Sequence, residues 1–249
     1  MTAIVDRLRA AGCVFAEQEA QLLFEAAGSP GELESLVARR IEGLPLEQLL
    51  GWVEFLDMRL AVGPGVFVPR KRTEFLALQA IERTRPGAVV VELCCGCAAV
   101  AAAVHDAVPG ARVHAAELDP EAVRYARHNC AQVHQGDLDE PLPGELAGRV
   151  GVLVANAPYV PSAEIAFMPP EARDHEPHRA LDGGPDGLDI ARRIAARAGH
   201  WLAPGGSLLI ETSTRQSAAL ADSFSANGLE PVVLHDEERA ATVVTGERR

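Results

Sequence analysis

The stretch Ala88-Val89-Val90-Val91-Glu92-Leu93-Cys94-Cys95-Gly96-Cys97-Ala98 decides the fold of this chain. Its first four residues have the apolar, Val-rich composition of a buried parallel strand, and the Ala-rich segment from about 98 to 108 is typical of a helix. A strand, a tight turn of small residues and a helix begin a nucleotide-binding βαβ unit. Gly96 lets the backbone of the turn approach a ligand closely. We therefore expect an α/β protein.

A second strand and an acidic residue follow the turn at the spacing of a ribose-binding site. Residues 112–116 predict a strand that ends in Glu117, about twenty residues beyond the turn, where a carboxylate can accept hydrogen bonds from ribose hydroxyls. Leu118 is its neighbour in the expected site. Asp137 and Leu138 fall where a third strand would end, so Asp137 could accept from an adenine amino group while Leu138 packs on the ring.

The composition of this site favours a cofactor without phosphates. The turn has a single glycine, whereas a dinucleotide fingerprint has three, and no basic side chain lies near it to meet a pyrophosphate. S-adenosylmethionine carries adenine and ribose, and its positive sulfonium tolerates Glu92 nearby. The residues expected to bind it are Glu92, Cys94, Cys95, Gly96, Cys97, Ala98, Glu117, Leu118, Asp137, Leu138 and Asn156.

The tetrapeptide Asn156-Ala157-Pro158-Tyr159 follows the apolar run 150–155, which predicts another buried strand. A polar side chain at the carboxyl end of such a strand faces the ligand crevice of an open α/β sheet. Pro158 restrains the loop, so an Asn side chain and backbone carbonyls could grip the two hydrogens of a planar amino or amide group. An ordinary strand-to-loop turn with an Asn cap is the structural alternative for the tetrapeptide taken alone.

From about residue 45 onward, the sequence resembles the protein-(glutamine) amide N-methyltransferases that modify peptide-chain release factors, including actinobacterial-type relatives of unassigned substrate. The family's Asn-Pro-Pro-Tyr matches residues 156–159, its Asp-Leu-x-x-Gly-x-Gly turn matches 92–98 and its ribose acid matches Glu117. Further matches are Val68-Pro69-Arg70, Thr73-Glu74, Glu176-Pro177, Ala180-Leu181, Glu211 and Gln216. The resemblance implies a class I, Rossmann-like methyltransferase fold, S-adenosylmethionine as cofactor and a release factor as substrate.

Three departures from the family pattern bear on this expectation. Ala157 replaces the first Pro of the motif but keeps the backbone carbonyl that the family uses, so we expect a looser loop with intact chemistry. Ala98 replaces the last Gly of the turn and is expected to crowd the cofactor slightly. Lys71-Arg72 replaces a Pro-Asp pair beside the active-site entrance, which bears on the substrate more than on the reaction.

The expected reaction is direct methyl transfer to an amide nitrogen, with Asn156, Ala157, Pro158 and Tyr159 as catalytic residues. The Asn156 side-chain carbonyl and the Ala157 backbone carbonyl would accept the two N–H groups of the acceptor, and Tyr159 would wall the slot. Three alternatives stay open: a methyltransferase acting on another protein or a small molecule, a nucleic-acid amino-methyltransferase, and a cofactor-binding scaffold without catalysis.

The chain divides into three expected segments. Residues 1–44 show helical spacing of apolar residues, with a helix start at Ser29-Pro30-Gly31-Glu32, and could contact a protein substrate. Residues 45–75 form a connector with short strands around Phe55–Val62 and Val66–Pro69. Residues 76–249 form the methyltransferase domain. Its sheet is expected to be mostly parallel and to end in strands at Gly206–Thr212, Leu229–Leu234 and Thr242–Thr245, with an antiparallel strand near the C-terminus.

Composition favours a cytoplasmic enzyme. The 249 residues contain 23 basic and 35 acidic side chains, a net charge of −12 that argues against non-specific nucleic-acid binding. No apolar run approaches membrane-spanning length, and no signal-peptide pattern opens the sequence. Five cysteines, three of them in one turn, do not form a secreted disulfide framework.

Two further patterns favour structural interpretations over chemical ones. Cys94-x-x-Cys97 could be a thioredoxin-like redox pair, or part of a metal site, but small side chains filling a tight turn explain it better. His175 and His178 are expected in a solvated loop because further metal ligands are not evident. We expect no metal.

Overall fold

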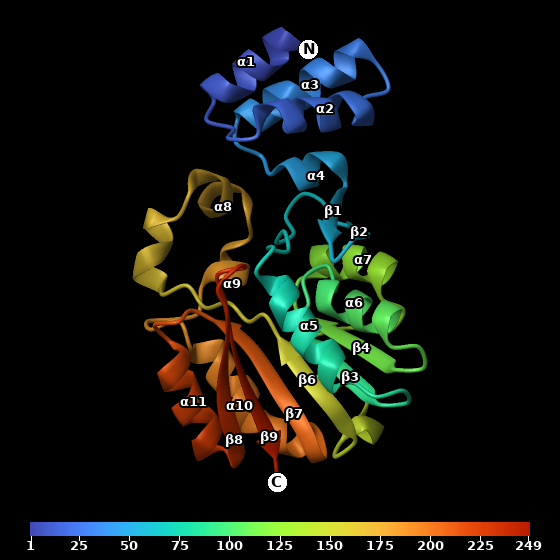
Figure 1. The fold of residues 1–249 in the computed structure, drawn as a ribbon, viewed down its shortest axis with the longest axis vertical. Coiled ribbons are helices and arrows are strands. Elements are labelled where there is room, and N and C mark those ends of the chain that lie inside the picture. The colour runs from blue at the N-terminus through green and yellow to red at the C-terminus, as the bar shows by residue number, and fades with distance from the viewer.

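A seven-stranded sheet organises the computed structural model, which describes residues 1–249 (Figure 1). The strand order is β5-β4-β3-β6-β7-β9-β8, and β9 alone runs antiparallel to its neighbours β7 and β8. The mostly parallel sheet with one antiparallel C-terminal strand is therefore confirmed. The strands are β3 (Val89–Leu93), β4 (Arg112–Glu117), β5 (Val133–Gln135), β6 (Val150–Ala155), β7 (Leu202–Thr212), β8 (Leu229–Asp236) and β9 (Ala241–Arg248).

Helices cover both faces of this sheet, as Figure 1 shows. One face packs against α5 (Thr73–Arg83), α6 (Ala99–Ala107) and α7 (Pro120–Asn129) in a core that includes Val90 and Val152. The other face packs against α10 (Asp189–Trp201) and α11 (Ser217–Ala226) in a core that includes Leu153 and Leu208. Valines at the centre of β3 and β6 are buried on both sides, which explains their continuous apolar runs. No helix of the structure has the length and apolar content to cross a bilayer.

The N-terminal helices share a small core of their own. They are α1 (Thr2–Ala10), α2 (Ala16–Ala26) and α3 (Pro30–Ile41), and Leu8, Leu23 and Val37 are fully buried between them. The expected helix start at Ser29 is confirmed, because the Ser29 hydroxyl accepts a hydrogen bond from the Glu32 amide at 3.2 Å. We propose residues 1–44 as a separate helical unit on the basis of this core.

The connector contains a helix that the sequence analysis did not expect, and it lacks one of the two expected strands. Helix α4 (Leu46–Leu50) leads into a hairpin of β1 (Trp52–Phe55) and β2 (Met58–Ala61). The expected strand at Val66–Pro69 is wrong: this segment has strand-like composition, but it pairs with no neighbouring strand. The side chains of Val66 and Val68 are instead buried in the core that contains α5 and α6, although their backbone belongs to no strand.

The segment between β6 and α10 folds over the carboxyl ends of the strands. It contains η2 (Ser162–Phe167), α8 (Pro170–His175) and α9 (His178–Leu181), and the short η1 (Gly144–Leu146) precedes β6. His175 and His178 were expected in a loop, and they lie instead in these two short helices. Glu171 of α8 pairs with Arg40 of α3 at 2.8 Å, which ties the segment to the N-terminal helices.

Candidate active site

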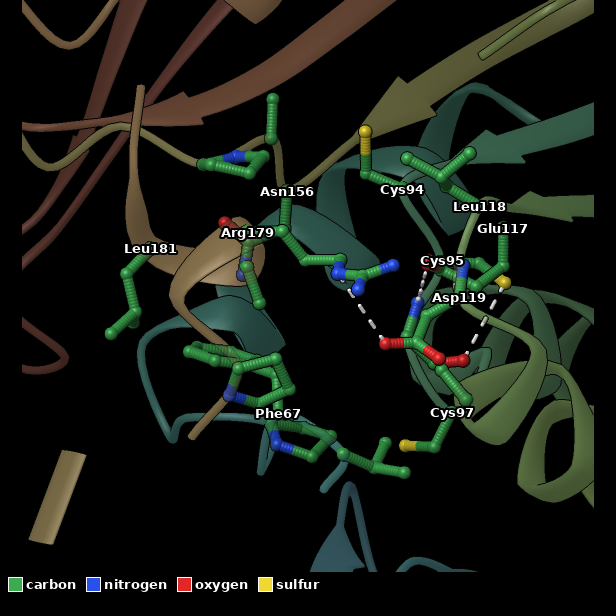
Figure 2. A pocket seen from close by; sticks show the side chains of 18 of the residues that line it. Phe67, Cys94, Cys95, Cys97, Glu117, Leu118, Asp119, Asn156, Arg179 and Leu181 are labelled. Atoms are coloured by element: carbon green, nitrogen blue, oxygen red, sulfur yellow. Dashed lines mark hydrogen bonds and ion pairs between the residues drawn. The ribbon is translucent and has the colours of Figure 1, made fainter. Parts of the chain in front are cut away.

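A cavity opens at the carboxyl ends of β3, β4 and β6, where open α/β sheets bind ligands (Figure 2). Cys95, Cys97 and Glu117 lie along one wall of this cavity, while Phe67 and Leu181 lie across from them. The structure thus brings the two expected halves of the site, the turn after β3 and the tetrapeptide after β6, into a single pocket. Of all the expected site residues, only Ala98 does not line it.

The turn after β3 is built from left-handed backbone. Cys94, Gly96 and Ala98 have φ angles of 52°, 55° and 63°. Nothing lies within 4 Å of a Cβ built on Gly96, so this glycine leaves open space on the ligand side. The Ala98 methyl is fully buried in the protein core. The expectation that Ala98 crowds the cofactor is not supported by this placement, and its cost is backbone strain instead.

The cysteines of the turn are poor candidates for redox chemistry. All five cysteines of the chain are free thiols. Burial raises the pKa of Cys94 and of Cys95, and it raises the pKa of Cys97 to about 12. A redox or metal-binding cysteine needs an accessible thiolate, which these environments disfavour. No three His, Cys, Asp or Glu side chains converge in the geometry of a metal site.

Glu92 caps helix α6. Its Oε2 accepts a hydrogen bond from the Ala101 amide at 2.7 Å, in the first turn of the helix that follows the cysteine turn. Burial raises the pKa of Glu92 to about 8, while hydrogen bonds from the Ala101 and Val100 amides oppose the rise. Glu92 lines the cavity but is only 3% exposed, so its main contact is with the helix terminus.

Glu117 connects the turn to the loop after β4. Its Oε2 accepts from the Gly96 amide at 2.8 Å, and its Oε1 accepts from the Asp119 amide at 2.9 Å. Burial raises the pKa of this carboxyl group. Each carboxylate oxygen has two lone pairs, so one on each remains for a ligand hydroxyl. This arrangement fits the cis-diol of a ribose.

The expected adenine end of the pocket has one charged and two apolar groups. Asp137 pairs with Arg193 at 2.6 Å. Arg193 therefore competes with the adenine amino group that the Asp137 carboxylate was expected to bind. Leu138 is buried in a left-handed conformation, whereas Leu118 is half exposed and its side chain is available to a flat ring. Sequence reasoning missed Ile190, which also lines this end.

The acceptor end of the pocket is formed by the tetrapeptide after β6. The Asn156 Nδ2 donates a hydrogen bond to Thr73 Oγ1 at 3.2 Å, and Ala157 is buried behind it. The Tyr159 hydroxyl donates to Glu211 Oε1 at 3.3 Å, and the Gln216 Nε2 donates to the Tyr159 carbonyl oxygen at 2.9 Å. Tyr159 is therefore held at both ends.

Three arginines line the pocket, and no sequence pattern predicted a binding role for any of them. Arg70 pairs with the buried Glu176 at 2.6 Å, and Arg179 approaches Asp119 at 3.7 Å across the pocket (Figure 2). Arg72 places its Nε 3.3 Å from Glu211, and its guanidinium lies 5.8 Å from the Tyr159 ring. Its two terminal nitrogens donate no hydrogen bond within the protein.

Comparisons with known proteins place the chain among methyltransferases. It is 43% identical over 201 residues to the release factor glutamine methyltransferase of Mycolicibacterium smegmatis, covering 78% of this chain and 71% of that protein. It is 36% identical over 223 residues to the 4-amino-L-phenylalanine/4-methylamino-L-phenylalanine methyltransferase of Streptomyces pristinaespiralis, covering 80% and 76%.

Among solved structures, a methyltransferase from Pyrococcus furiosus superposes with a TM-score of 0.59 at 16% identity, covering 85% of this chain and 96% of that one. A likeness at this identity speaks for the fold alone. No family model matches the chain.

Proposed function

The chain belongs to the family of release factor glutamine methyltransferases, and on that premise we propose that it methylates the side-chain amide nitrogen of a glutamine in a peptide-chain release factor. S-adenosylmethionine is the methyl donor. The observation that carries the proposal is the position of Asn156, whose amide lies in the same cavity as the Glu117 carboxylate and the open face of Gly96. This substrate implies the cytoplasm, where translation ends.

The residues of the pocket fit this cofactor. Glu117 keeps lone pairs for the ribose hydroxyls, and Leu118 and Ile190 offer apolar surface for the adenine. The three arginines that line the cavity are each paired with a carboxylate, and Glu117 and Asp137 add acidic groups, which suits a cofactor that is cationic at sulfur and lacks phosphates. When bound, the cofactor supplies a methyl group on a positively charged sulfur.

The amide nitrogen of the acceptor needs help to react, because its lone pair is delocalised into the carbonyl group. This delocalisation underlies the roughly 18–20 kcal/mol barrier to rotation of an amide bond. The Asn156 Oδ1 and the Ala157 carbonyl oxygen accept the two N–H groups of the acceptor, which holds its nitrogen in one orientation as positive charge develops. Positioning of this kind can contribute about 7–11 kcal/mol. The methylated nitrogen then loses a proton to water.

Mass spectrometry of a release factor incubated with the protein and S-adenosylmethionine tests the proposal. One added methyl group on the glutamine of the Gly-Gly-Gln loop is expected, and none with Asn156→Ala. That variant should still bind the cofactor in calorimetry, because the cofactor contacts of Glu117 and the turn are unchanged. Full turnover by Asn156→Ala would refute the assigned role of the asparagine.

A free amino acid with an aromatic amine is the second candidate acceptor. One relative is named for methylation of 4-amino-L-phenylalanine, and Arg72 leaves two guanidinium nitrogens free at the acceptor end, where they could meet an α-carboxylate. Incubation with equal amounts of release factor and 4-amino-L-phenylalanine distinguishes the candidates. Preferential methylation of the amino acid, with no methyl on the release factor, would reassign the substrate.

We also propose that the N-terminal helices contact the protein substrate. Val14, Phe15 and Phe24 are apolar side chains at least half exposed on this unit, and none of them lines the cavity. Exposed aromatic side chains are common in the centre of protein–protein contacts.

A further inference from the structure

Gln216 joins three segments that are far apart in the sequence. It precedes α11, is 6% exposed and does not line the cavity. Its Nε2 donates to the carbonyl oxygen of Tyr159 at 2.9 Å and to that of Asp186 at 2.8 Å. Tyr159 ends the tetrapeptide after β6, and Asp186 lies in the loop 182–188 that leads into α10. One buried amide thus holds both loops to the start of α11.

The Gln216 amide fits these partners in one orientation only. The Ser213 hydroxyl donates to Gln216 Oε1, and the NH₂ group faces the two backbone carbonyl oxygens. A carbonyl oxygen can only accept, and an NH₂ group has two hydrogens, one for each oxygen. An apolar side chain of the same length would leave both carbonyl oxygens without this donor.

The loop 182–188 lies directly against the backbone of the tetrapeptide because two of its residues are glycines. A Cβ built on Gly187 would overlap the Gln216 nitrogen and the Tyr159 carbonyl oxygen. A Cβ built on Gly183 would lie 2.6 Å from the Pro158 carbonyl oxygen. The close approach therefore depends on the absence of side chains at these two positions.

We propose that Gln216 is a positioning residue for methyl transfer, which holds the far end of the tetrapeptide so that the Ala157 carbonyl oxygen stays directed at the acceptor. This inference rests on the proposed function. β6 ends at Ala155, and Ala157 has no ring to fix its backbone, so the direction of its carbonyl depends on how the chain is held on each side. Pro158 restricts one backbone angle, and Gln216 holds the carbonyl oxygen of the residue after it. The same amide holds the loop that precedes Ile190, which links the acceptor slot to the adenine end of the pocket.

Steady-state kinetics of Gln216→Met tests this role. The variant removes both donors at nearly constant length, and we expect kcat to fall on the order of 10²-fold, the cost of displacing a reacting group by about 1 Å. Calorimetry should give an unchanged Kd for S-adenosylmethionine, because the hydrogen bonds of Glu117 involve neither loop. Ser217→Ala is the matched control: it removes a buried hydroxyl that donates to the Thr214 carbonyl oxygen at 2.9 Å at the same helix start, and it should keep wild-type kcat.

Gln216→Glu supplies a readout that a purely structural role would not move. Its ionised form sets a second oxygen against the two carbonyl oxygens, whereas its protonated form has one O–H group that can restore one of the two bonds. The ratio of variant kcat to wild-type kcat should therefore rise as pH falls. The titratable groups on the three joined segments already have partners: Arg215 with Glu164, Asp186 with Arg192, Asp182 with His178 and Tyr159 with Glu211.

Hydrogen exchange without any acceptor separates this inference from the proposed substrate. The Val160 amide donates to the Leu181 carbonyl oxygen at 3.0 Å, and the Gly183 amide donates to the Val160 carbonyl oxygen at 2.9 Å, so both amides report on the contact between the loops. Both should exchange faster in Gln216→Met than in Ser217→Ala. A wild-type protein that leaves release factor unmethylated, while the variants show this difference, would refute the proposed function alone. Wild-type kcat in Gln216→Met, an equal loss in Ser217→Ala, or a Gln216→Glu ratio that does not change with pH would overturn the positioning role.

Discussion

Ala98 stores backbone strain, and a single methyl deletion measures it. Ala98 precedes α6 with φ 63° and ψ 44°, a left-handed conformation that costs an L-residue about 1–2 kcal/mol. Ala98→Gly removes that cost. It also removes a buried methyl group, worth about 0.8 kcal/mol, and loosens the unfolded chain by about 0.4–1 kcal/mol. These effects nearly cancel, so we expect the free energy of unfolding to change by less than about 1 kcal/mol.

Ala103→Gly is the matched control for this substitution. Ala103 is 2% exposed, lies in the same core and has ordinary helical backbone. Its replacement loses about 0.8 kcal/mol of methyl burial and about 0.8–1.0 kcal/mol of helix propensity, with no strain to relieve. Ala98→Gly should therefore be the more stable of the two by about 1–2 kcal/mol.

Urea unfolding followed by circular dichroism measures this difference as a shift of the midpoint at constant slope. Equal destabilisation by the two glycines would refute the assignment of strain to Ala98. Calorimetry supplies an independent check, because the Ala98 methyl lies in the core: the affinity of Ala98→Gly for S-adenosylmethionine should equal that of the wild type.

Four further outcomes follow from the geometry of the site. Glu117→Ala should weaken cofactor binding at least about tenfold in calorimetry, since hydrogen bonds to a charged group contribute about 1.5–3 kcal/mol each; an unchanged Kd would exclude the ribose role. Glu92 has a folded-state pKa of about 8, above its ordinary value, so stability should fall as pH rises through that pKa. In thermal melts at pH 5 to 9, the melting temperature of Glu92→Gln should depend less on pH than that of the wild type. An equal dependence in both proteins would contradict the assignment. Arg72→Gln removes a cation beside Glu211, so the pKa of Glu211 should rise; a Glu211 carboxyl signal in nuclear magnetic resonance that titrates at the wild-type pH would contradict this pairing. Phe15→Ser with Phe24→Ser should raise KM for a release factor but not for a short glutamine peptide, with the exposed Val232→Ser on β8 as control.

The sequence predicted the parts of the site that depend on strand ends. Glu117 and Asn156 each follow a strand of a parallel sheet, so their side chains meet at one edge once the strands are identified. Composition alone failed at Val66–Pro69, where strand-forming residues have no neighbouring strand to pair with. It also failed at Ala98, where the side-chain direction follows from a backbone angle that no spacing pattern encodes.

The contacts of Arg72, Thr73 and Glu211 lay beyond sequence reasoning for a different reason. Arg72 and Glu211 are separated by more than half of the chain, and they meet because α5 packs against β6 and β7. A matched motif can name Thr73 and Glu211, but it does not say that Asn156 donates to Thr73 or that Arg72 pairs with Glu211. Their role emerges only when the donors and acceptors of the buried groups are assigned together.

Arg72 joins substrate choice to the reaction step. Its Nε lies 3.3 Å from the buried Glu211, whose charge it offsets, and Arg72 also lines the pocket, where its terminal nitrogens have no hydrogen bond within the protein. An acceptor carboxylate bound to those nitrogens would share the guanidinium charge with Glu211 and raise the pKa of the Glu211 carboxyl group. An uncharged glutamine side chain would leave that charge to Glu211 alone. Binding of 4-amino-L-phenylalanine should therefore raise the pKa of Glu211, whereas binding of a glutamine peptide should leave it unchanged, and titration of the Glu211 carboxyl signal with each acceptor measures the difference.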